Sequence, residues 1–569
     1  MNRKKFVELV TVGSGALAAT SISGLPEVFH ISTRRAGTVY NANELSADAV
    51  ICGGGLGGCA AAMAALRNNL SVIMTEETDW IGGQIAQQGV PPDEHQWIET
   101  HGSTKLYRDF RNSIRQYYRQ NYPLTDNARE NKYLNPGDGS VSRLCHEPRV
   151  ALAVLRDMLA PYISSKKLVL MIEYKIEGAD VSGNQVHSLK AVNQISGKSI
   201  ILTAPYFVDA TELGDLLPLT GTEFITGTES RKDTGELHAP EKANPDNIQA
   251  FTMCFAMDYI PGENQVIEKP RDYDFWKNFK PNLNPSWPGK LLDLTYSEPT
   301  TLKPINEGFN PERTSNLWDY RRIINKNNFK PNTYLSDITV VNWPQNDYLP
   351  GNLIGVSSAE FKKQVESAKQ LSLSLLYWLQ TEVPRPDKGY GWPGIRLRPD
   401  IMGTEDGFAK HPYIRESRRI KALFTVLEEH VGMENRSLIT GKKKDNTAAD
   451  FHDSVGIGYY HIDLHPSNAG TNYIDVDSLP FRIPLGALIP VRVENLIPAN
   501  KNIGTTHITN GCYRLHPVEW NIGESAGSLI AFALNKKVTP REVRERKEFL
   551  LEFQSFIHSQ GIETEWPKQ

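Results

Sequence analysis

The stretch from Asp48 to Gly58 constrains the fold of this chain more than any other. A short apolar run, Ala49–Cys52, ends in glycines at positions 53, 55 and 58, and the alanine-rich run Cys59–Asn68 follows. This pattern predicts a strand, a tight turn and a helix. In a dinucleotide-binding turn the first glycine allows the turn, the second leaves room for a pyrophosphate, and the third lets helix pack on strand. The helix N-terminus then offers unpaired N–H groups to the phosphates.

Two features downstream of this turn strengthen the nucleotide interpretation. The apolar run Ser71–Thr75 predicts a second strand that ends at Glu76, 18 residues after Gly58. A carboxylate there accepts hydrogen bonds from an adenosine ribose, at an expected spacing of about 20 residues. A further glycine pair precedes Gln84 and allows close approach of the backbone to a ligand. An ordinary glycine-rich turn in an α/β protein is the alternative. The expected cofactor-binding residues here are Gly53, Gly54, Gly55, Leu56, Gly57, Gly58, Glu76, Gly82, Gly83 and Gln84.

Length and composition exclude several classes of protein. With 569 residues, the chain buries a large core and is too long for one simple domain, so we expect two lobes. A formal net charge of -4 gives no reason to expect a nucleic-acid partner. The five cysteines form no close C-x-x-C pair, which argues against a zinc site or a disulfide framework. We therefore assign no metal site.

The N-terminus has the pattern of a bacterial export signal. Arg3-Lys4-Lys5 precedes Phe6-Val7, and a mildly apolar run follows to Ala19. The order resembles a twin-arginine signal in which lysine replaces one arginine. Ala16-Leu17-Ala18 is a candidate cleavage site, whereas Glu8 inside the apolar run disfavours the signal. We expect a periplasmic or otherwise exported protein; a cytoplasmic protein with an N-terminal extension is the alternative. Elsewhere no run approaches the ~18 apolar residues of a membrane span, so we expect none in the mature protein.

Small residues also follow a strand in the middle of the chain. The runs 168–172, 186–192 and 200–208 predict a meander of strands. The last run opens into Asp209-Ala210-Thr211-Glu212-Leu213-Gly214-Asp215, where small residues let the backbone approach a ligand or the first glycine turn. We therefore expect Asp209 and Ala210 at the cofactor.

Residues 222–475 show no clean repeat beyond a predicted amphipathic helix at Phe361–Thr381. Arg415 begins a basic cluster, and buried arginine forks hold carboxylates, although a surface salt-bridge cluster is the alternative. Alternation puts His461, Asp463 and His465 on one side of an extended run, where structural or substrate-contacting roles are favoured over metal ligation. His146 precedes a predicted helix from Pro148 to about residue 159. It either faces a substrate or bonds to the local turn.

The C-terminal part again carries small-residue motifs. Asn495–Asn500 predicts a short strand that ends in small and polar residues, followed by Gly504-Thr505-Thr506-His507. A helix then runs to Leu534 with Gly523 and Gly527 on it. Its N-terminus stabilises negative charge, such as that on a reduced flavin; tight packing in a core is the alternative. The expected cofactor contacts in this part are Asn502, Gly504 and Gly523.

Together these segments resemble the FAD-dependent oxidoreductases of the glutathione-reductase-like flavoprotein class, and more narrowly a bacterial group with an Asp-Ala-Thr-x-x-Gly-Asp motif. The resemblance implies an α/β fold with a Rossmann-like FAD-binding domain and an inserted α+β substrate, or cap, domain. It also implies an extended FAD with its adenosine near Glu76, its pyrophosphate on Gly53–Gly58 and its flavin near Gly82-Gly83. One departure is Glu212, where the wider class often has glycine.

The implied domains follow the order of these motifs. Signal peptide and linker would occupy residues 1–45. Residues 46–221 and 476–540 would form the two parts of the FAD-binding domain, with the cap domain at 222–475 between them and a helical tail at 541–569.

The expected function is an FAD-dependent oxidoreductase that moves hydride between a small polar organic substrate and flavin N5. His507 and His516 are candidates for the catalytic base, and Arg514 and Arg415 for binding a carboxylate or oxyanion; each has a structural role as its alternative. The electron acceptor is left open. An NAD-dependent dehydrogenase and a non-catalytic dinucleotide-binding protein are the rival interpretations.

Overall fold

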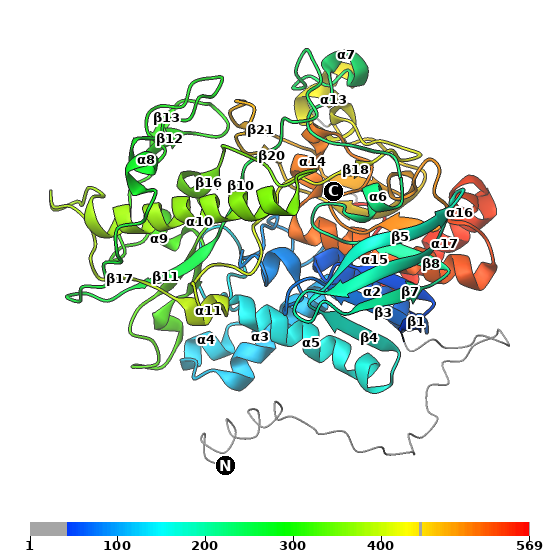
Figure 1. Cartoon of the computed structure of the whole chain (residues 1–569), viewed down its shortest axis with the longest axis horizontal. Helices are drawn as coiled ribbons and strands as arrows, with labels where there is room; N and C mark the ends of the chain where they lie inside the picture. The colour runs from blue at the N-terminus through cyan, green and yellow to red at the C-terminus, as the bar shows by residue number, and fades with distance from the viewer. Residues whose placement is uncertain (1–42, 443–445, 568–569) are drawn as a thin grey trace. The chain divides into compact units, whose positions relative to one another are not determined.

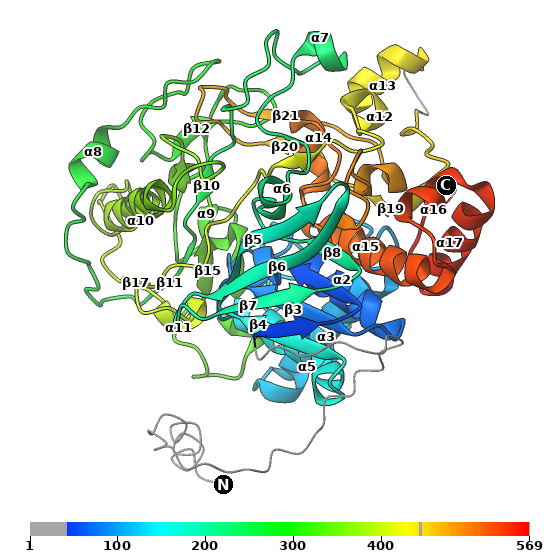
Figure 2. The ribbon, with the colours of Figure 1, turned by 45° about the vertical axis from the view of Figure 1, so that its right-hand side comes forward.

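The computed structural model describes residues 43–442 and 446–567. The expected export signal lies outside these residues. In Figures 1 and 2 the strands β3, β4 and β8 gather with α2 and α15 on one side, and β11, β17 and α10 gather on the other.

A five-stranded sheet of parallel strands forms the nucleotide-binding side, which confirms the expected α/β class. Its order is β4-β3-β2-β8-β23, so the first strand of the motif lies at the centre. The strands are short apolar runs because both faces of a parallel sheet are covered. The strand order reverses at β2, and ligands bind beyond the carboxyl ends of the strands at such a point. The strands are β2 (Ala49–Cys52), β3 (Val72–Glu76), β4 (Leu168–Ile172), β8 (Tyr206–Asp209) and β23 (Leu496–Pro498).

Two helices from opposite parts of the sequence pack against each other beside this sheet. They are α2 (Leu56–Arg67) and α15 (His516–Lys536). A Cβ atom on Gly523 would lie 2.0 Å from the carbonyl oxygen of Gly57, and one on Gly527 would lie 2.2 Å from that of Ala61. Only glycine allows backbones to approach this closely. This contact accounts for Gly523, so the packing alternative describes it better than cofactor contact does.

Only part of the predicted meander forms a second sheet, because the run 168–172 is β4 of the parallel sheet, and two further predictions here are wrong in detail. The order of this second sheet is β1-β7-β6-β5. Residues 44 and 45, expected in a linker, begin β1 (Glu44–Ser46), which pairs with β7 in parallel. The run 200–208 is two strands in different sheets, because Pro205 has no N–H to continue a ladder. The other strands are β5 (Tyr174–Ser182), β6 (Gln185–Asn193) and β7 (Ser199–Thr203).

A second apolar core fills the middle of the chain. An antiparallel sheet of order β14-β15-β11-β17 lies there with helix α10 (Ser358–Thr381). The helix begins three residues before its predicted start because the Ser357 side chain accepts the Glu360 N–H and caps it. Its buried leucines recur every four residues and face the core. The strands are β11 (Phe255–Tyr259), β14 (Arg322–Ile324), β15 (Ile338–Val341) and β17 (Ile395–Leu397).

Shorter elements connect these layers. The remaining helices are α3 (Lys105–Asn121), α4 (Asp126–Glu130), α5 (Pro148–Ser164), α6 (Leu216–Leu219), α7 (Arg231–Thr234), α8 (Tyr273–Asn278), α9 (Leu317–Tyr320), α11 (Pro399–Met402), α12 (Glu428–Val431), α13 (Met433–Thr440), α14 (His507–Tyr513), α16 (Pro540–Glu545) and α17 (Lys547–Ser559). The remaining strands are β9 (Phe224–Ile225), β10 (Phe251–Thr252), β12 (Thr295–Ser297), β13 (Pro304–Asn306), β16 (Asp347–Tyr348), β18 (Arg419–Ile420), β19 (Ser454–Gly458), β20 (Ile462–Leu464), β21 (Ile474–Val476) and β22 (Phe481–Pro484). Within the described ranges, every helix is too short or too polar to cross a bilayer.

Replacing Gly523 with alanine should destabilise the protein, because the new methyl group meets the backbone of α2. Forced overpacking of this kind costs about 2–3 kcal/mol of unfolding free energy. Gly289→Ala is the matched control, since no atom lies within 4 Å of its added Cβ. Chemical denaturation of both variants measures the difference, and equal stabilities would contradict the helix contact.

Candidate functional site

The glycine turn is held from both sides by backbone. Gly53 has a φ of +99°, and a Cβ on it would lie 2.2 Å from the carbonyl oxygen of Ala210. The small residues after β8 therefore approach the first glycine turn, which was one of the two expectations for them. Gly55 is the N-cap residue of α2 and has no side chain to cap the helix, and the first turn of α2 contains no acid of its own. Glu519 occupies the N–H of Gly57, and the other first amides of α2 are available to an anion.

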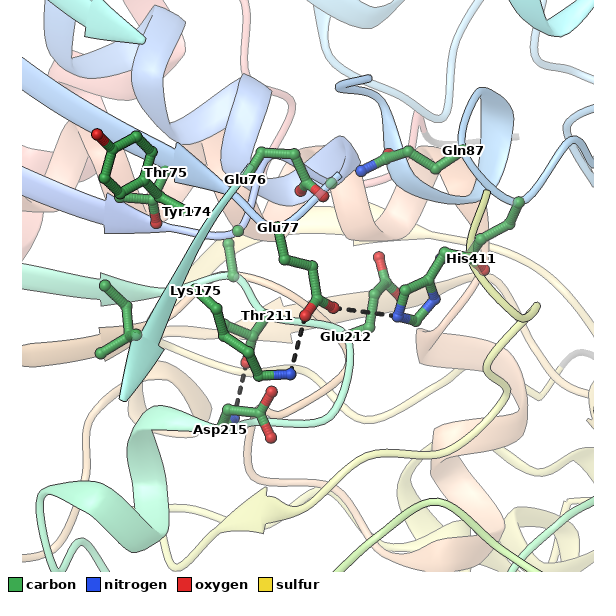
Figure 3. Close-up of a pocket in the computed structure, with 15 residues that line it drawn as sticks. Thr75, Glu76, Glu77, Gln87, Tyr174, Lys175, Thr211, Glu212, Asp215 and His411 are labelled. Atoms are coloured by element: carbon green, nitrogen blue, oxygen red, sulfur yellow. Dashed lines mark hydrogen bonds and ion pairs between the residues drawn. The ribbon is translucent and has the colours of Figure 1, made fainter. Parts of the chain in front are cut away.

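A cavity lies beside this turn, at the carboxyl ends of β2, β3 and β8 (Figure 3). It encloses about 500 Å³, including space open to solvent. Its walls come from the glycine turn, the ends of β3 and β8, the start of β5, and two loops. The lining residues are Gly53, Gly55, Thr75, Glu76, Glu77, Gln87, Gln88, Tyr174, Lys175, Ile176, Ala210, Thr211, Glu212, Asp215 and His411.

Glu76 ends β3 and fixes the turn from inside the cavity. Its Oε2 accepts the N–H of Gly54 at 2.9 Å, and its Oε1 accepts the N–H and hydroxyl of Thr78 at 2.8 and 2.9 Å. Burial, with a smaller contribution from Glu77, raises the pKa of Glu76 to about 7. Each carboxylate oxygen accepts two hydrogen bonds, so Glu76 keeps capacity for a ribose hydroxyl.

A charged group that sequence reasoning missed lies next to Glu76. Figure 3 shows Glu77 between Lys175 and His411, at 2.8 and 3.2 Å. Burial opposes the charge on Glu77, but these two partners hold its pKa well below the usual range. Burial alone would lower the pKa of His411, yet Glu77 raises it to about 9. No spacing signal marks either partner, because Lys175 lies in the meander and His411 in a distant loop.

Two further acids, the largely buried Glu212 and the buried Glu519, lie close to Gly55. Lys501 Nζ pairs with Oε2 of Glu212 at 2.5 Å, so the residue that departs from the family pattern holds a buried lysine. Glu519 Oε1 accepts the N–H of Gly57 at 3.1 Å, and Gln84 donates to the other oxygen of Glu519. Burial raises the pKa of Glu519 to about 7, whereas Lys501 lowers the pKa of Glu212 against the effect of burial.

These residues fit a dinucleotide such as FAD. The start of α2 opens onto the cavity at its N-cap residue Gly55, where a Cβ would lie 3.1 Å from Oε1 of Glu212. That Glu212 oxygen is buried without a hydrogen-bond partner. The buried Lys501 brings positive charge, and Glu76 provides a ribose acceptor at the end of β3. Bare backbone, a cation and an acid are the groups that a pyrophosphate and a ribose require.

The second glycine pair also reaches the turn. The N–H of Gly82 donates to the carbonyl oxygen of Gly54 at 2.7 Å, and a Cβ on Gly83 would lie 2.9 Å from Cα of Gly55. Gln84 donates through Nε2 to the carbonyl oxygen of Arg514 at 2.9 Å. This loop therefore joins the glycine turn to the C-terminal motif.

The other predicted cofactor residues brace the backbone. Asp209 accepts the N–H groups of Thr211 and Leu216 at 3.1 and 3.2 Å. Asn502 donates to the carbonyl oxygen of Asp209 at 3.0 Å. A Cβ on Gly504 would lie 2.5 Å from Cβ of Ala422. Their contacts are with protein, and none of the three lines the cavity.

A buried arginine cluster lies beyond Gln84. Its members are Arg321, Arg415 and Arg514, each at most 7% exposed. Arg321 pairs with Asp93 at 3.1 Å, Arg415 with Asp347 at 2.9 Å, and Arg514 with Asp463 at 2.8 Å. The structure therefore brings the two predicted anion-binding arginines together. It adds Arg321, which no motif indicated.

Tyr413 and His465 connect the members of the arginine cluster. Arg514 Nη1 donates to the Tyr413 hydroxyl at 3.3 Å, and the guanidinium of Arg415 lies 5.0 Å from the centroid of the Tyr413 ring. His465 lies 2.6 Å from Asp347 through Nδ1 and 3.7 Å from Asp463 through Nε2. His461 pairs with Asp475 instead. Across the described ranges, no three His, Cys, Asp or Glu side chains are grouped to hold a metal.

The predicted catalytic histidines differ in what they can do. His516 Nδ1 accepts the N–H of Asp93 at 3.1 Å, and burial lowers the pKa of His516 to about 4. A neutral ring with Nδ1 occupied carries its proton on Nε2, so His516 is a donor there and does not fit the role of base. His507 Nδ1 bonds to Glu416 at 2.9 Å. His507 therefore donates through Nδ1 to the Glu416 carboxylate.

His146 bonds to its own turn, which was one of its two expected roles. Its Nδ1 lies 2.9 Å from the carbonyl oxygen of Glu147. Burial lowers the pKa of His146 to about 4, so the ring is neutral at physiological pH. It makes no hydrogen bond to the arginine cluster.

Comparison with protein families gives one extensive match. The model of a family described as FAD dependent oxidoreductase matches residues 48–555. Curated proteins compared with the chain give no significant match.

Similarity to solved structures is distant. The L-proline dehydrogenase from P. horikoshii is 16% identical, with a TM-score of 0.17, over 33% of this chain and 24% of that one. A variant of the E. coli quinol fumarate reductase FrdA is 11% identical, with a TM-score of 0.30, over 91% and 74%. OxyS anhydrotetracycline hydroxylase from Streptomyces rimosus is 8% identical, with a TM-score of 0.31, over 90% and 66%. The chain thus spans about a quarter of the dehydrogenase's length. At these TM-scores no argument rests on the likenesses.

Glu519 should make dinucleotide binding depend on pH. Its carboxyl group occupies an amide of the α2 N-terminus, and its pKa of about 7 means that it gains negative charge across neutrality. That charge repels a pyrophosphate, so the Kd for FAD should rise roughly three- to tenfold between about pH 6 and pH 8. Glu519→Gln should flatten the profile. Glu524→Gln, on the same helix but paired with Arg67, is the control and should keep it. An unchanged profile in Glu519→Gln would refute this role.

Proposed function

This chain belongs to the family of FAD dependent oxidoreductases, and we propose that it holds one FAD beside Gly53–Gly55 to oxidise or reduce a small polar organic substrate. When bound, FAD supplies a ring that accepts or donates a hydride at N5. One observation supports the proposal most. Gly55, the N-cap residue of α2, lines a cavity at the reversal of strand order between β2 and β8, and Glu76 lies at the end of the next strand.

Different residues around the cavity would hold the adenosine, pyrophosphate and flavin parts of the cofactor. Glu76 would bind the adenosine ribose, with Tyr174 and Ile176 beside it. The amides at the start of α2 and the positive charge of Lys501 would offset the pyrophosphate charge. The glycine pair at 82 and 83 would bring bare backbone towards the flavin end.

We propose a glutathione-reductase-like division of domains. Residues 46–221 and 476–540 would form the FAD-binding domain, residues 222–475 an inserted cap domain, and residues 541–569 a tail. The pairing of β8 with β23 supports the two-part domain, because it joins strands nearly 300 residues apart. The separate apolar core around α10 supports an inserted domain.

The arginine cluster and two histidines would serve the substrate side. Gln84 of the second glycine loop bonds to the backbone carbonyl of Arg514, and His516 follows Arg514 by two residues. His516 would donate a hydrogen bond from Nε2. His507 would take or return at Nε2 the proton that accompanies hydride transfer, since Glu416 holds its Nδ1–H. A second substrate, an electron acceptor or donor, would complete the cycle.

Two rival functions explain fewer of the observed features of this chain. An NAD-dependent dehydrogenase shares the glycine turn and Glu76, but not the return of the C-terminal motif to that turn. A non-catalytic dinucleotide-binding protein needs neither the buried arginine cluster nor the His507–Glu416 pair. Family membership favours the flavin enzyme over both.

The purified protein should carry FAD and exchange electrons. We expect the visible absorbance of an oxidised flavin, FAD in the mass spectrum of the material released by denaturation, bleaching by dithionite without oxygen, and recovery with a quinone or dioxygen. Nicotinamide dinucleotide alone, or a bound flavin that dithionite cannot reduce, would contradict the proposal.

We also propose export of the protein, on the basis of the basic and apolar pattern of residues 3–19. Fractionation of cells that produce the full chain should find it outside the cytoplasm. A chain without residues 2–24 should stay inside. If the full chain and the shortened chain distribute equally between the cell fractions, the cytoplasmic alternative is favoured.

A further inference from the structure

Each of the three arginines in the cluster has one buried N–H without a partner. These are the Nε groups of Arg321, Arg415 and Arg514. The outer nitrogens are engaged: each guanidinium pairs with its own aspartate, and Arg415 also donates to the carbonyl oxygen of Ala250 at 2.8 Å. A buried donor without an acceptor costs about 1–3 kcal/mol. Three in one cluster mark a place where an acceptor belongs.

Tyr413 lies near the guanidinium groups of all three arginines. It contacts Arg415 through its ring and Arg514 through its hydroxyl. Burial raises the pKa of Tyr413, and the charges of all three arginines act against that rise. A charge changes a pKa strongly only over a short distance, so each guanidinium must lie near the Tyr413 phenol.

The unpartnered atoms of the cluster all have the same polarity. Asn342 accepts from Arg415 through Oδ1 at 3.1 Å, and its Nδ2 has no partner. This amide joins the three Nε–H groups, so the cluster presents four donors. Each arginine is already balanced by an aspartate, so the cluster offers directed hydrogen bonds more than net positive charge. A single planar carboxylate, with two oxygens and about four lone-pair sites, suits such donors better than a polyanion does.

We propose that the substrate of this oxidoreductase carries a carboxylate, held by the Nε–H groups of the arginine cluster and by Asn342. This inference rests on the proposed function and names its substrate class. The carboxylate would lie on the side of the cluster near Gln84, which bonds to the backbone carbonyl of Arg514 and to Glu519. The Nε2–H of His516, also buried without a partner, is a further donor on that side.

Acetate, acetamide and inorganic phosphate are the probes, used with the full chain as purified. Binding is followed through the broadening of methyl proton signals in NMR spectra, and of the phosphorus signal for phosphate. Flavin content is recorded separately from absorbance. We expect acetate to bind, and acetamide, which has the same shape without the charge, to bind at least tenfold more weakly. Equal binding of acetate and acetamide, or binding of phosphate in place of acetate, would overturn the proposal.

Adjacent arginines provide a matched pair of variants. Arg321→Lys keeps a positive charge for Asp93 but removes the free Nε–H. Arg322→Lys is the control, because Arg322 is also buried but pairs with Asp337 at 2.9 Å and donates its Nε–H to Gly137 at 2.7 Å. We expect Arg321→Lys to weaken acetate binding about tenfold, equivalent to about 1.4 kcal/mol, and Arg322→Lys to leave it unchanged.

Two outcomes separate this inference from the proposed function. Equal loss of acetate binding in Arg321→Lys and Arg322→Lys would assign the effect to folding and overturn the carboxylate site. Acetate binding that depends on Arg321 in a protein without FAD would overturn the oxidoreductase and with it the carboxylate as its substrate. FAD binding without acetate binding would refute the carboxylate site alone.

Discussion

The nucleotide site depends on contact between the start of α2 and chain from the far end of the sequence. A Cβ on Gly57 would lie 1.6 Å from the carbonyl oxygen of Ala499, and the Gly57 N–H donates to Glu519. The glycine turn is therefore closed by residues more than 440 positions away. The position of the turn depends on the packing of β23 against β8 and of α15 against α2. The same contact brings the buried acid Glu519 to the start of α2.

The acids divide into two groups by their partners. Glu77 and Glu212 are neutralised by His411, Lys175 and Lys501 and stay charged. Within the described residues, Glu76 and Glu519 have hydrogen bonds but no ion pair, so burial raises the pKa of each to about 7, although Lys501 acts against the rise at Glu519. The site thus combines two acids of fixed charge with two acids whose charge changes near neutral pH. A bound anion changes the balance of the second group first.

Local pattern was enough to predict the parts of the site that lie on regular elements. The strand, turn and helix around Gly53, the acid at Glu76 and the C-terminal helix all follow from spacing, because each is set by neighbouring residues. The sequence predicts one strand around Pro205 where the structure has two, because an apolar run does not reveal where a chain passes from one sheet to another. The sequence also places Gly523 at the cofactor, whereas in the structure its missing Cβ allows the contact with α2. Arg321, Tyr413 and His411 could not be found at all, because only the tertiary fold brings them to the site.

The central claim is that one dinucleotide is held by both ends of the chain at once. Hydrogen exchange measured by mass spectrometry, on the protein with and without FAD, tests it most directly. We expect FAD to slow hydrogen exchange in both segments 53–58 and 499–519, with little change in α8 or α13. Protection confined to the glycine turn, or absent from both segments while FAD is bound, would contradict it.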